Sequence, residues 1–228
     1  PVTPVQKYLG AASDGTALVD RNGPVTLRMQ RELWKQADQT FTVVKDDGTE
    51  ICKVISQNGR QVITSMSDEK LAIVVHSVRY SEVNGVDASF NLPHVYIYAF
   101  SAYKDDQTPA EFEDGGKKLY YWGRVHKMAG SKPTADSKNT KKNFIASMAN
   151  QKGTGGSLLE MFSGEDYSAT MFPPDGNIAA KRYGKVGAVT ASQSDENQDQ
   201  LTVSLAANVD QAFAICMIII MEYLSQFQ

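Results

Sequence analysis

Val209 to Leu224 reads VDQAFAICMIIIMEYL, and this segment constrains the fold of the chain more than any other. Ala212 to Met221 is an unbroken run of apolar or small residues, so a helix here has no polar stripe and needs cover on every side. A helix of this length spans about 24 Å. A helix that crosses a bilayer needs ~20 apolar residues, which is longer than this segment. We therefore predict a buried central helix, with a C-terminal lipid anchor as the alternative.

Asn208 is the predicted N-cap of this helix, with Gln211 three positions later as in a capping box. The residues expected to form the core of the domain from this helix are Val209, Phe213, Ile215, Met217, Ile218, Ile219, Ile220 and Leu224.

Composition indicates an ordinary globular protein: 228 residues, 42% hydrophobic, 21% charged, net charge −3. The absence of a basic excess argues against nucleic acid as a partner. Cys52 and Cys216 each lie in an apolar run and are interpreted as buried thiols, with no disulfide framework or metal motif. No secretory signal pattern opens the sequence, and we expect a cytoplasmic protein, with peripheral contact to membranes as an option.

Most of the remaining chain shows short β-branched and aromatic runs separated by turn residues. Phe41 to His76 is the most regular part, with turns at Asp46-Asp47-Gly48 and Gln57-Asn58-Gly59, and it predicts an antiparallel meander. We divide the chain into an arm, 1–20, and one domain, 21–228, with an acidic insertion, 104–117, and a basic connector, 127–142. Pro173 to Asn177 is expected to be the sharpest turn.

About ten or eleven strands are predicted, and the C-terminal helix is the single convincing helix. A sheet of that length must split or close to protect its edges. An apolar helix needs a surrounding wall. Together these requirements predict an all-β fold, namely a closed antiparallel barrel around the C-terminal helix.

The two ends of the chain resemble LURP-one-related proteins. FTVVKDDGTEICKV (Phe41 to Val54) and RQVITSMSDEKLAIV (Arg60 to Val74) are similar to that family's opening hairpins, and Leu201 to Leu224 resembles its ending. QAFAIC (Gln211 to Cys216) is also similar to the end of tubby C-terminal domains. The resemblance implies the tubby C-terminal-like fold, a barrel of about 12 strands around a hydrophobic helix, with phospholipid scramblases as distant relatives.

A first functional hypothesis follows from that superfamily, in which tubby domains bind phosphoinositide headgroups through Lys and Arg. We expect a non-catalytic module that docks on anionic phospholipid, to which clustered cations are attracted. No lipid-binding residue transfers from the family; the candidates in this chain are Lys181, Arg182, Lys185, Arg124, Lys127, Lys141 and Lys142. The alternative is that these are solvated charges that keep strand ends and loops soluble.

A second hypothesis is a structural or interaction protein that self-assembles or joins a larger complex. Aromatic residues gather on two consecutive predicted strands, and some must face outward because side chains alternate. The candidates for this interface are Tyr96, Tyr98, Tyr103, Tyr121 and Trp122. Tyrosine and tryptophan are enriched at protein interfaces, although packing across the strand pair explains them equally well. The acidic and basic segments could pair between copies.

The sequence offers little support for catalysis. His76, His94 and His126 have no histidine or carboxylate at ligand spacing and are interpreted as structural. Lys152 to Ser157 is glycine-rich but lacks the P-loop pattern. A barrel filled by a helix leaves no lumen for a substrate. We therefore expect no enzyme, cofactor or metal.

Overall fold

The computed structural model describes residues 18–57, 60–76, 94–100, 112–114, 117–127, 142–148, 167–172, 175–180, 184–191 and 200–225. The strands in these ranges are β1 (Val25–Gln30), β2 (Gln39–Lys45), β3 (Glu50–Gln57), β4 (Arg60–Ser65), β5 (Lys70–His76), β6 (His94–Ala99), β7 (Phe112–Asp114), β8 (Lys117–Lys127), β9 (Lys142–Met148), β10 (Tyr167–Phe172), β11 (Asp175–Ala180), β12 (Gly184–Ala191) and β13 (Gln200–Leu205). A short 3-10 helix, η1 (Leu33–Lys35), follows β1, and the α-helix α2 (Gln211–Leu224) follows β13.

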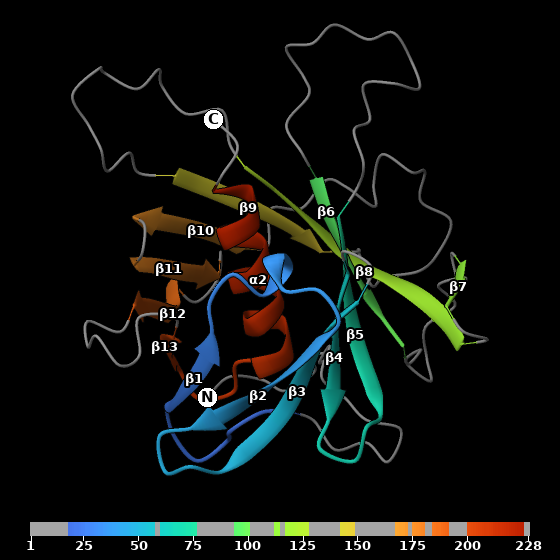
Figure 1. Ribbon diagram of the computed structural model, residues 1–228. Coiled ribbons are helices and arrows are strands. Elements are labelled where there is room, and N and C mark those ends of the chain that lie inside the picture. Colours follow the sequence, from blue (N-terminus) through green and yellow to red (C-terminus); the bar gives the residue numbers. More distant parts are fainter. Residues whose placement is uncertain are drawn as a thin grey trace, which may run out of the picture.

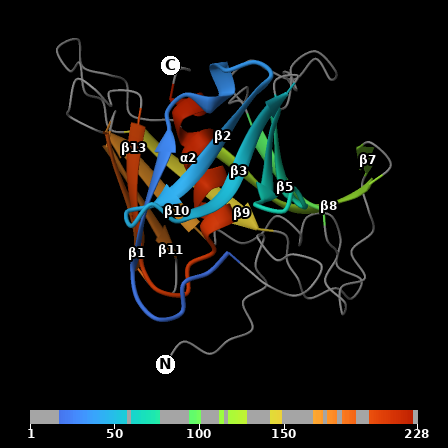
Figure 2. The same cartoon turned by 60° about the horizontal axis from the view of Figure 1, so that its bottom comes forward.

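All the strand pairings are antiparallel, and they join the strands in the order β6-β5-β4-β3-β2-β1-β13-β12-β11-β10-β9-β8-β7. β6 pairs with β5 along one edge and with β8 along the other. Strands lie on several sides of α2, as Figures 1 and 2 show. β7 pairs with the first residues of β8, and this hairpin projects from the rest of the sheet in both views.

The helix α2 is buried as its sequence requires. Every residue from Gln211 to Glu222 is buried, and Ile215 to Met221 are fully inaccessible to solvent. Their partners are alternate residues of the strands, such as Leu27, Val54 and Ile97, which belong to the same core cluster. The prediction of an all-β fold with one buried C-terminal helix is confirmed.

The predicted start of the helix is wrong by two residues. Asp210, not Asn208, is the N-cap, and its carboxylate accepts a hydrogen bond from the N–H of Phe213 at 3.0 Å. Asn208 instead has a φ of 64°, in the left-handed region that asparagine tolerates. Val209 therefore precedes the helix, where it is partly buried against the core.

Several strand boundaries also differ from the predictions. Asp175, Gly176 and Asn177 lie in β11 rather than in a turn, because each pairs with a residue of β10. The acidic insertion contains strand β7 and the first residue of β8, and Lys127 and Lys142 of the basic connector are strand residues.

The turn between β2 and β3 confirms its prediction. Lys45 and Thr49 close the hairpin, with the N–H of Lys45 donating to the carbonyl of Thr49 at 2.8 Å. Gly48 has a φ of 86°, which glycine adopts without a steric cost.

Both cysteines are free and buried, as predicted, and burial raises the pKa of Cys52 to about 12.

Candidate functional site

The outer side of strands β3 to β6 carries a second apolar cluster, separate from the core around α2. Alternate residues of these strands contact the helix-side core, and the residues between them face the opposite side. We call this second group the outer apolar surface; its members are Ile55, Val62, Ile73, Val75, Tyr96, Tyr98 and Phe100.

Register places these residues in rows across the strands. Ile55 is paired with Val62, Val62 with Ile73, and Ile73 with Tyr98. Val62, Ile73 and Tyr98 are buried, whereas the other members of the surface are partly exposed. Tyr96 and Tyr98 lie with ring centroids 6.3 Å apart. The result is a continuous apolar face with aromatic side chains at one side.

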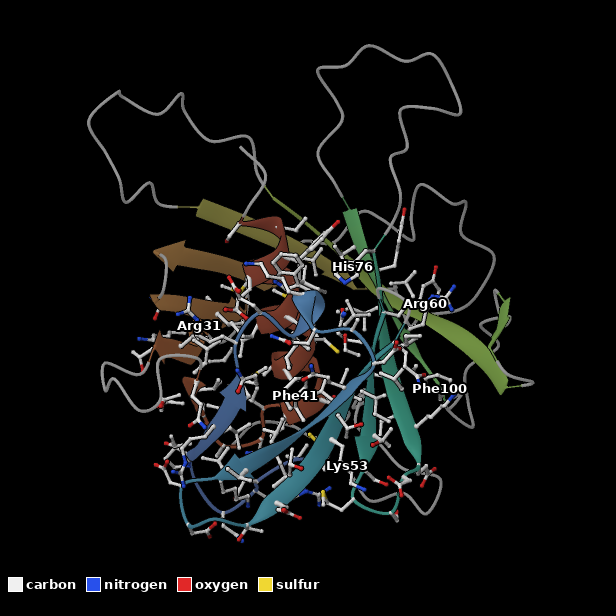
Figure 3. The ribbon with its side chains drawn as sticks, viewed as in Figure 1. Arg31, Phe41, Lys53, Arg60, His76 and Phe100 are labelled. Carbon is white, nitrogen blue, oxygen red and sulfur yellow. The ribbon has the colours of Figure 1, made fainter. Side chains whose placement is uncertain are left out.

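Charged residues border this surface. Arg60 and Phe100 lie on the side of β4 and β5 that points away from α2 (Figure 3). The ammonium group of Lys70 lies 5.4 Å above the centre of the Phe100 ring. Lys53 pairs with Asp68 at 2.8 Å near the same edge. The centre of the cluster, Val62, Ile73 and Tyr98, is already buried within the chain, so its partly exposed members and the charged border are the part that a partner could contact.

The predicted interface residues are brought together in part. Tyr96 and Tyr98 belong to the outer apolar surface, and Tyr121 is the register partner of Tyr98. Trp122 lies beside the register shift in the β6–β8 ladder. Tyr103 lies outside the described residues.

Sequence reasoning missed the aliphatic members of the surface. The signal was present: β4 contains Val62 and Ile63 in succession, and β5 contains the unbroken run Leu71 to Val75. A strand with apolar residues at consecutive positions is covered on both faces, whereas alternation indicates one covered face.

The predicted basic candidates are not gathered at one place among the described residues. Lys185 is exposed on β12, whereas Arg124 and Lys127 lie on β8, and β9, β10 and β11 separate these two strands in the sheet order. Lys142 begins β9. Lys141, Lys181 and Arg182 lie outside the described residues.

A polar network lies at the C-terminal end of α2. Nε2 of His76 donates to Oε1 of Gln61 at 2.6 Å, because an amide oxygen only accepts. Gln61 then donates to Oγ of Ser56 at 3.4 Å, and Ser56 donates to the carbonyl of Leu33 at 3.1 Å. The His76 ring also packs on Tyr223 of α2, with ring centroids 4.1 Å apart. The interpretation of His76 as a structural histidine fits this arrangement.

Glu222 fixes the segment that carries η1 to the same end of the helix. Its Oε2 accepts a hydrogen bond from the N–H of Glu32 at 2.9 Å, and Oε1 lies 3.6 Å from Nε of Arg31. Burial raises the pKa of Glu222, and the Glu32 N–H and the Arg31 guanidinium oppose that rise. Burial lowers the pKa of His76 to about 4. These groups hold β1, η1 and α2 together.

His94 and His126 are exact register partners across β6 and β8, although 31 positions separate them in the sequence. The positions of these two histidines in the sequence did not predict this pairing. Within the described residues, no group of three or more His, Cys, Asp or Glu could hold a metal ion.

Comparison with solved structures finds a protein of similar fold. No family model and no curated protein matches the chain. The structure is similar to an X-ray structure of a protein from Arabidopsis thaliana, with 13% sequence identity, coverage of 91% of this chain and 94% of that chain, and a TM-score of 0.45. Membership of the LURP-one-related family stays a prediction.

Among the helices that the structure describes, none is both long enough and apolar enough to cross a bilayer.

Proposed function

We propose that this protein is a non-catalytic interaction module that associates with a second copy of itself through the outer apolar surface. The observation that carries this proposal is the apolar cluster on the outer side of β3 to β6, which is separate from the core around α2. Partly exposed members such as Val75, Tyr96 and Phe100 lose solvent-exposed apolar area when a second copy packs on them, which favours association.

The opposite charges of the acidic insertion and the basic connector in the sequence support a second copy as the partner. The acidic insertion begins soon after the end of β6, and the basic connector begins at the end of β8. Because β6 and β8 are antiparallel, these ends lie at opposite sides of the surface. In sequence, the insertion 104–117 and the connector 127–142 carry opposite charges, which favours pairing between two copies related by a twofold axis.

Docking on phosphoinositide headgroups is the competing hypothesis. It requires cations that converge on one anionic group. The separation of Lys185 from β8 in the sheet order favours the interaction module. The scramblase-like alternative requires α2 in a bilayer, whereas α2 is covered by strands of its own chain.

We also propose that the sheet forms a closed barrel of about 12 strands, β1–β6 and β8–β13, of the tubby C-terminal-like type. Pairing of β6 with both β5 and β8 supports closure. The hairpin motifs and the terminal helix support the LURP-one-related family.

Light scattering on the purified protein tests the interaction role. We expect a mass above that of one chain without lipid, and a smaller mass at high salt as the end charges are screened. A double variant, Val75→Glu with Phe100→Glu, should be monomeric. Each new carboxylate lies near a cation, because Arg60 is the register partner of Val75 and Lys70 lies over Phe100, so the fold should persist.

Ser204→Glu on β13 is the matched control, since Ser204 is exposed and lies on a distant strand. This control should keep the mass of the unmodified protein, and all three proteins should give the same circular dichroism spectrum. A monomeric unmodified protein that co-floats with phosphoinositide liposomes would replace the proposal with lipid docking. An assembly whose mass is unchanged by the double variant would exclude this surface.

A further inference from the structure

The ladder between β1 and β2 is short. All six residues of β1 pair with β13, but only Leu27 and Arg28 pair with β2. Beyond Arg28 the two strands diverge, and a pocket with a volume of about 200 Å³ lies there. Its walls come from β1, β2 and the first residue of β13.

The lining of this pocket has an apolar part and a polar part. Phe41 and Val44 supply the apolar contacts, whereas Met29 lies beneath them and is almost fully buried in the core. Gln30 and Gln200 supply amide groups, and they stand next to each other because they are register partners. Figure 3 shows Phe41 on β2, in front of α2.

Arg28 provides a fixed cation at this pocket. Its Nη2 donates to the carbonyls of Asp46 and Lys45, at 3.1 and 3.5 Å, and its Nε lies 3.7 Å from a carboxylate oxygen of Asp46. The Nε atom is buried and has no hydrogen-bond partner within the structure. These contacts hold the guanidinium plane in one orientation, which lowers the entropic cost of binding an anion.

We propose that this pocket binds a carboxylate attached to a small apolar group, such as an aromatic ring or an aliphatic chain. Arg28 and the amides of Gln30 and Gln200 bind the carboxylate, and Phe41 and Val44 contact the apolar group. A carboxylate fits better than a phosphate dianion, because the carboxylate of Asp46 lies next to Arg28 and repels a second negative charge.

The volume sets the size of the ligand. Pockets for drug-sized molecules measure about 300–1,000 Å³, so this pocket accommodates a single ring or one amino-acid side chain. A free carboxylic acid and the C-terminal residue of a peptide both present this chemistry. The site is independent of the proposed self-association, since it lies on β1, β2 and β13 rather than on β3 to β6.

Titration followed by NMR amide shifts tests the inference, with 3-phenylpropanoate as the free acid and acetyl-Ala-Ala-Phe as the peptide. We expect saturable shifts at residues of β1 and β2, and binding at least tenfold weaker for 3-phenylpropanamide. The Arg28→Gln variant should weaken acid binding at least tenfold. Lys185→Gln, which removes an exposed cation on β12, should leave it unchanged.

The source of the carboxylate follows from the relative affinities. Tighter binding of the peptide identifies a peptide C-terminus, and tighter binding of the free acid identifies a small metabolite. Three results would overturn the proposal: equal binding of the acid and the amide, tighter binding of phenyl phosphate, or no amide shifts at about 10 mM acid. A ligand that causes no shifts at about 10 mM binds too weakly to matter. Light scattering on Arg28→Gln separates the two proposals, because this variant should keep the mass of the unmodified protein.

Discussion

His76 shows how a single residue links the helix to the sheet. Its ring lies against Tyr223 of α2, and its Nε2 donates to Gln61 of β4. Burial favours the neutral imidazole, which is why its pKa falls from 6.5 to about 4. A positive charge at this position would lie against the end of the core.

We expect the stability of the fold to fall as the pH is lowered through the range from 6.5 to about 4. A histidine with a lowered pKa in the folded state stabilises the protein above its unfolded pKa, and the contribution disappears as the pH falls to the folded pKa. The largest loss from His76 is about 3 kcal/mol. Urea unfolding at a series of pH values measures it.

His76→Gln is the matched variant, because a glutamine amide can still donate to Gln61 but does not titrate. Its free energy of unfolding should change less between pH 7 and pH 4 than that of the unmodified protein. An identical pH profile for both proteins would show that His76 is not the titrating group.

Among the elements, α2 begins at an N-cap, Asp210, that lies two residues after the predicted one, Asn208. Gln211 donates its N–H to the carbonyl of Leu18, and Val19 forms a bridge with Asp210. The end of the predicted arm therefore lies against the start of the helix. Asp210 is buried there, and its carboxylate satisfies one of the helix's unpaired N–H groups.

Asp210→Ala should destabilise the protein by about 1 kcal/mol, the usual cost of losing an N-cap. Asp210→Asn should recover part of this loss, since asparagine is also a good cap. Asn208→Gly is the control at the position that the sequence favoured; with its φ of 64° it should be neutral or stabilising. Thermal unfolding followed by circular dichroism compares the three variants. A larger loss at Asn208 than at Asp210 would contradict the assignment.

At the scale of the whole molecule, the helix and the sheet stabilise each other. A helix with no polar face has no stable place in water, and the inner faces of the strands have no other cover among the described residues. We therefore expect folding to be cooperative, with no stable sheet in the absence of α2.

Ile218→Asp tests this dependence. Ile218 is fully buried, so an aspartate there places an unpaired charge in the core at a cost of several kcal/mol. We expect loss of the folded state, seen as a lack of cooperative melting and poor soluble expression. Ser204→Asp, on the exposed side of β13, should fold normally. Normal melting of Ile218→Asp would disprove the buried-helix structure.

The class of fold could be predicted from local sequence signals. Ten consecutive apolar or small residues in α2 leave no polar face, and Asp46-Asp47-Gly48 specifies its hairpin without help from distant residues. The position of the cap is not determined locally, since asparagine and aspartate are both favourable caps. The contacts with Leu18 and Val19 place the cap at Asp210.

Tyr96 and Tyr98 were interface candidates in the sequence, but the rest of both candidate sites depends on strand pairing. The outer apolar surface depends on the register that aligns Ile55, Val62, Ile73 and Tyr98 across four strands. The pocket at Arg28 depends on where β1 leaves β2, which no local pattern indicates. Surfaces and pockets are made by residues far apart in the chain, so their chemistry appears only when strand pairing brings those residues together.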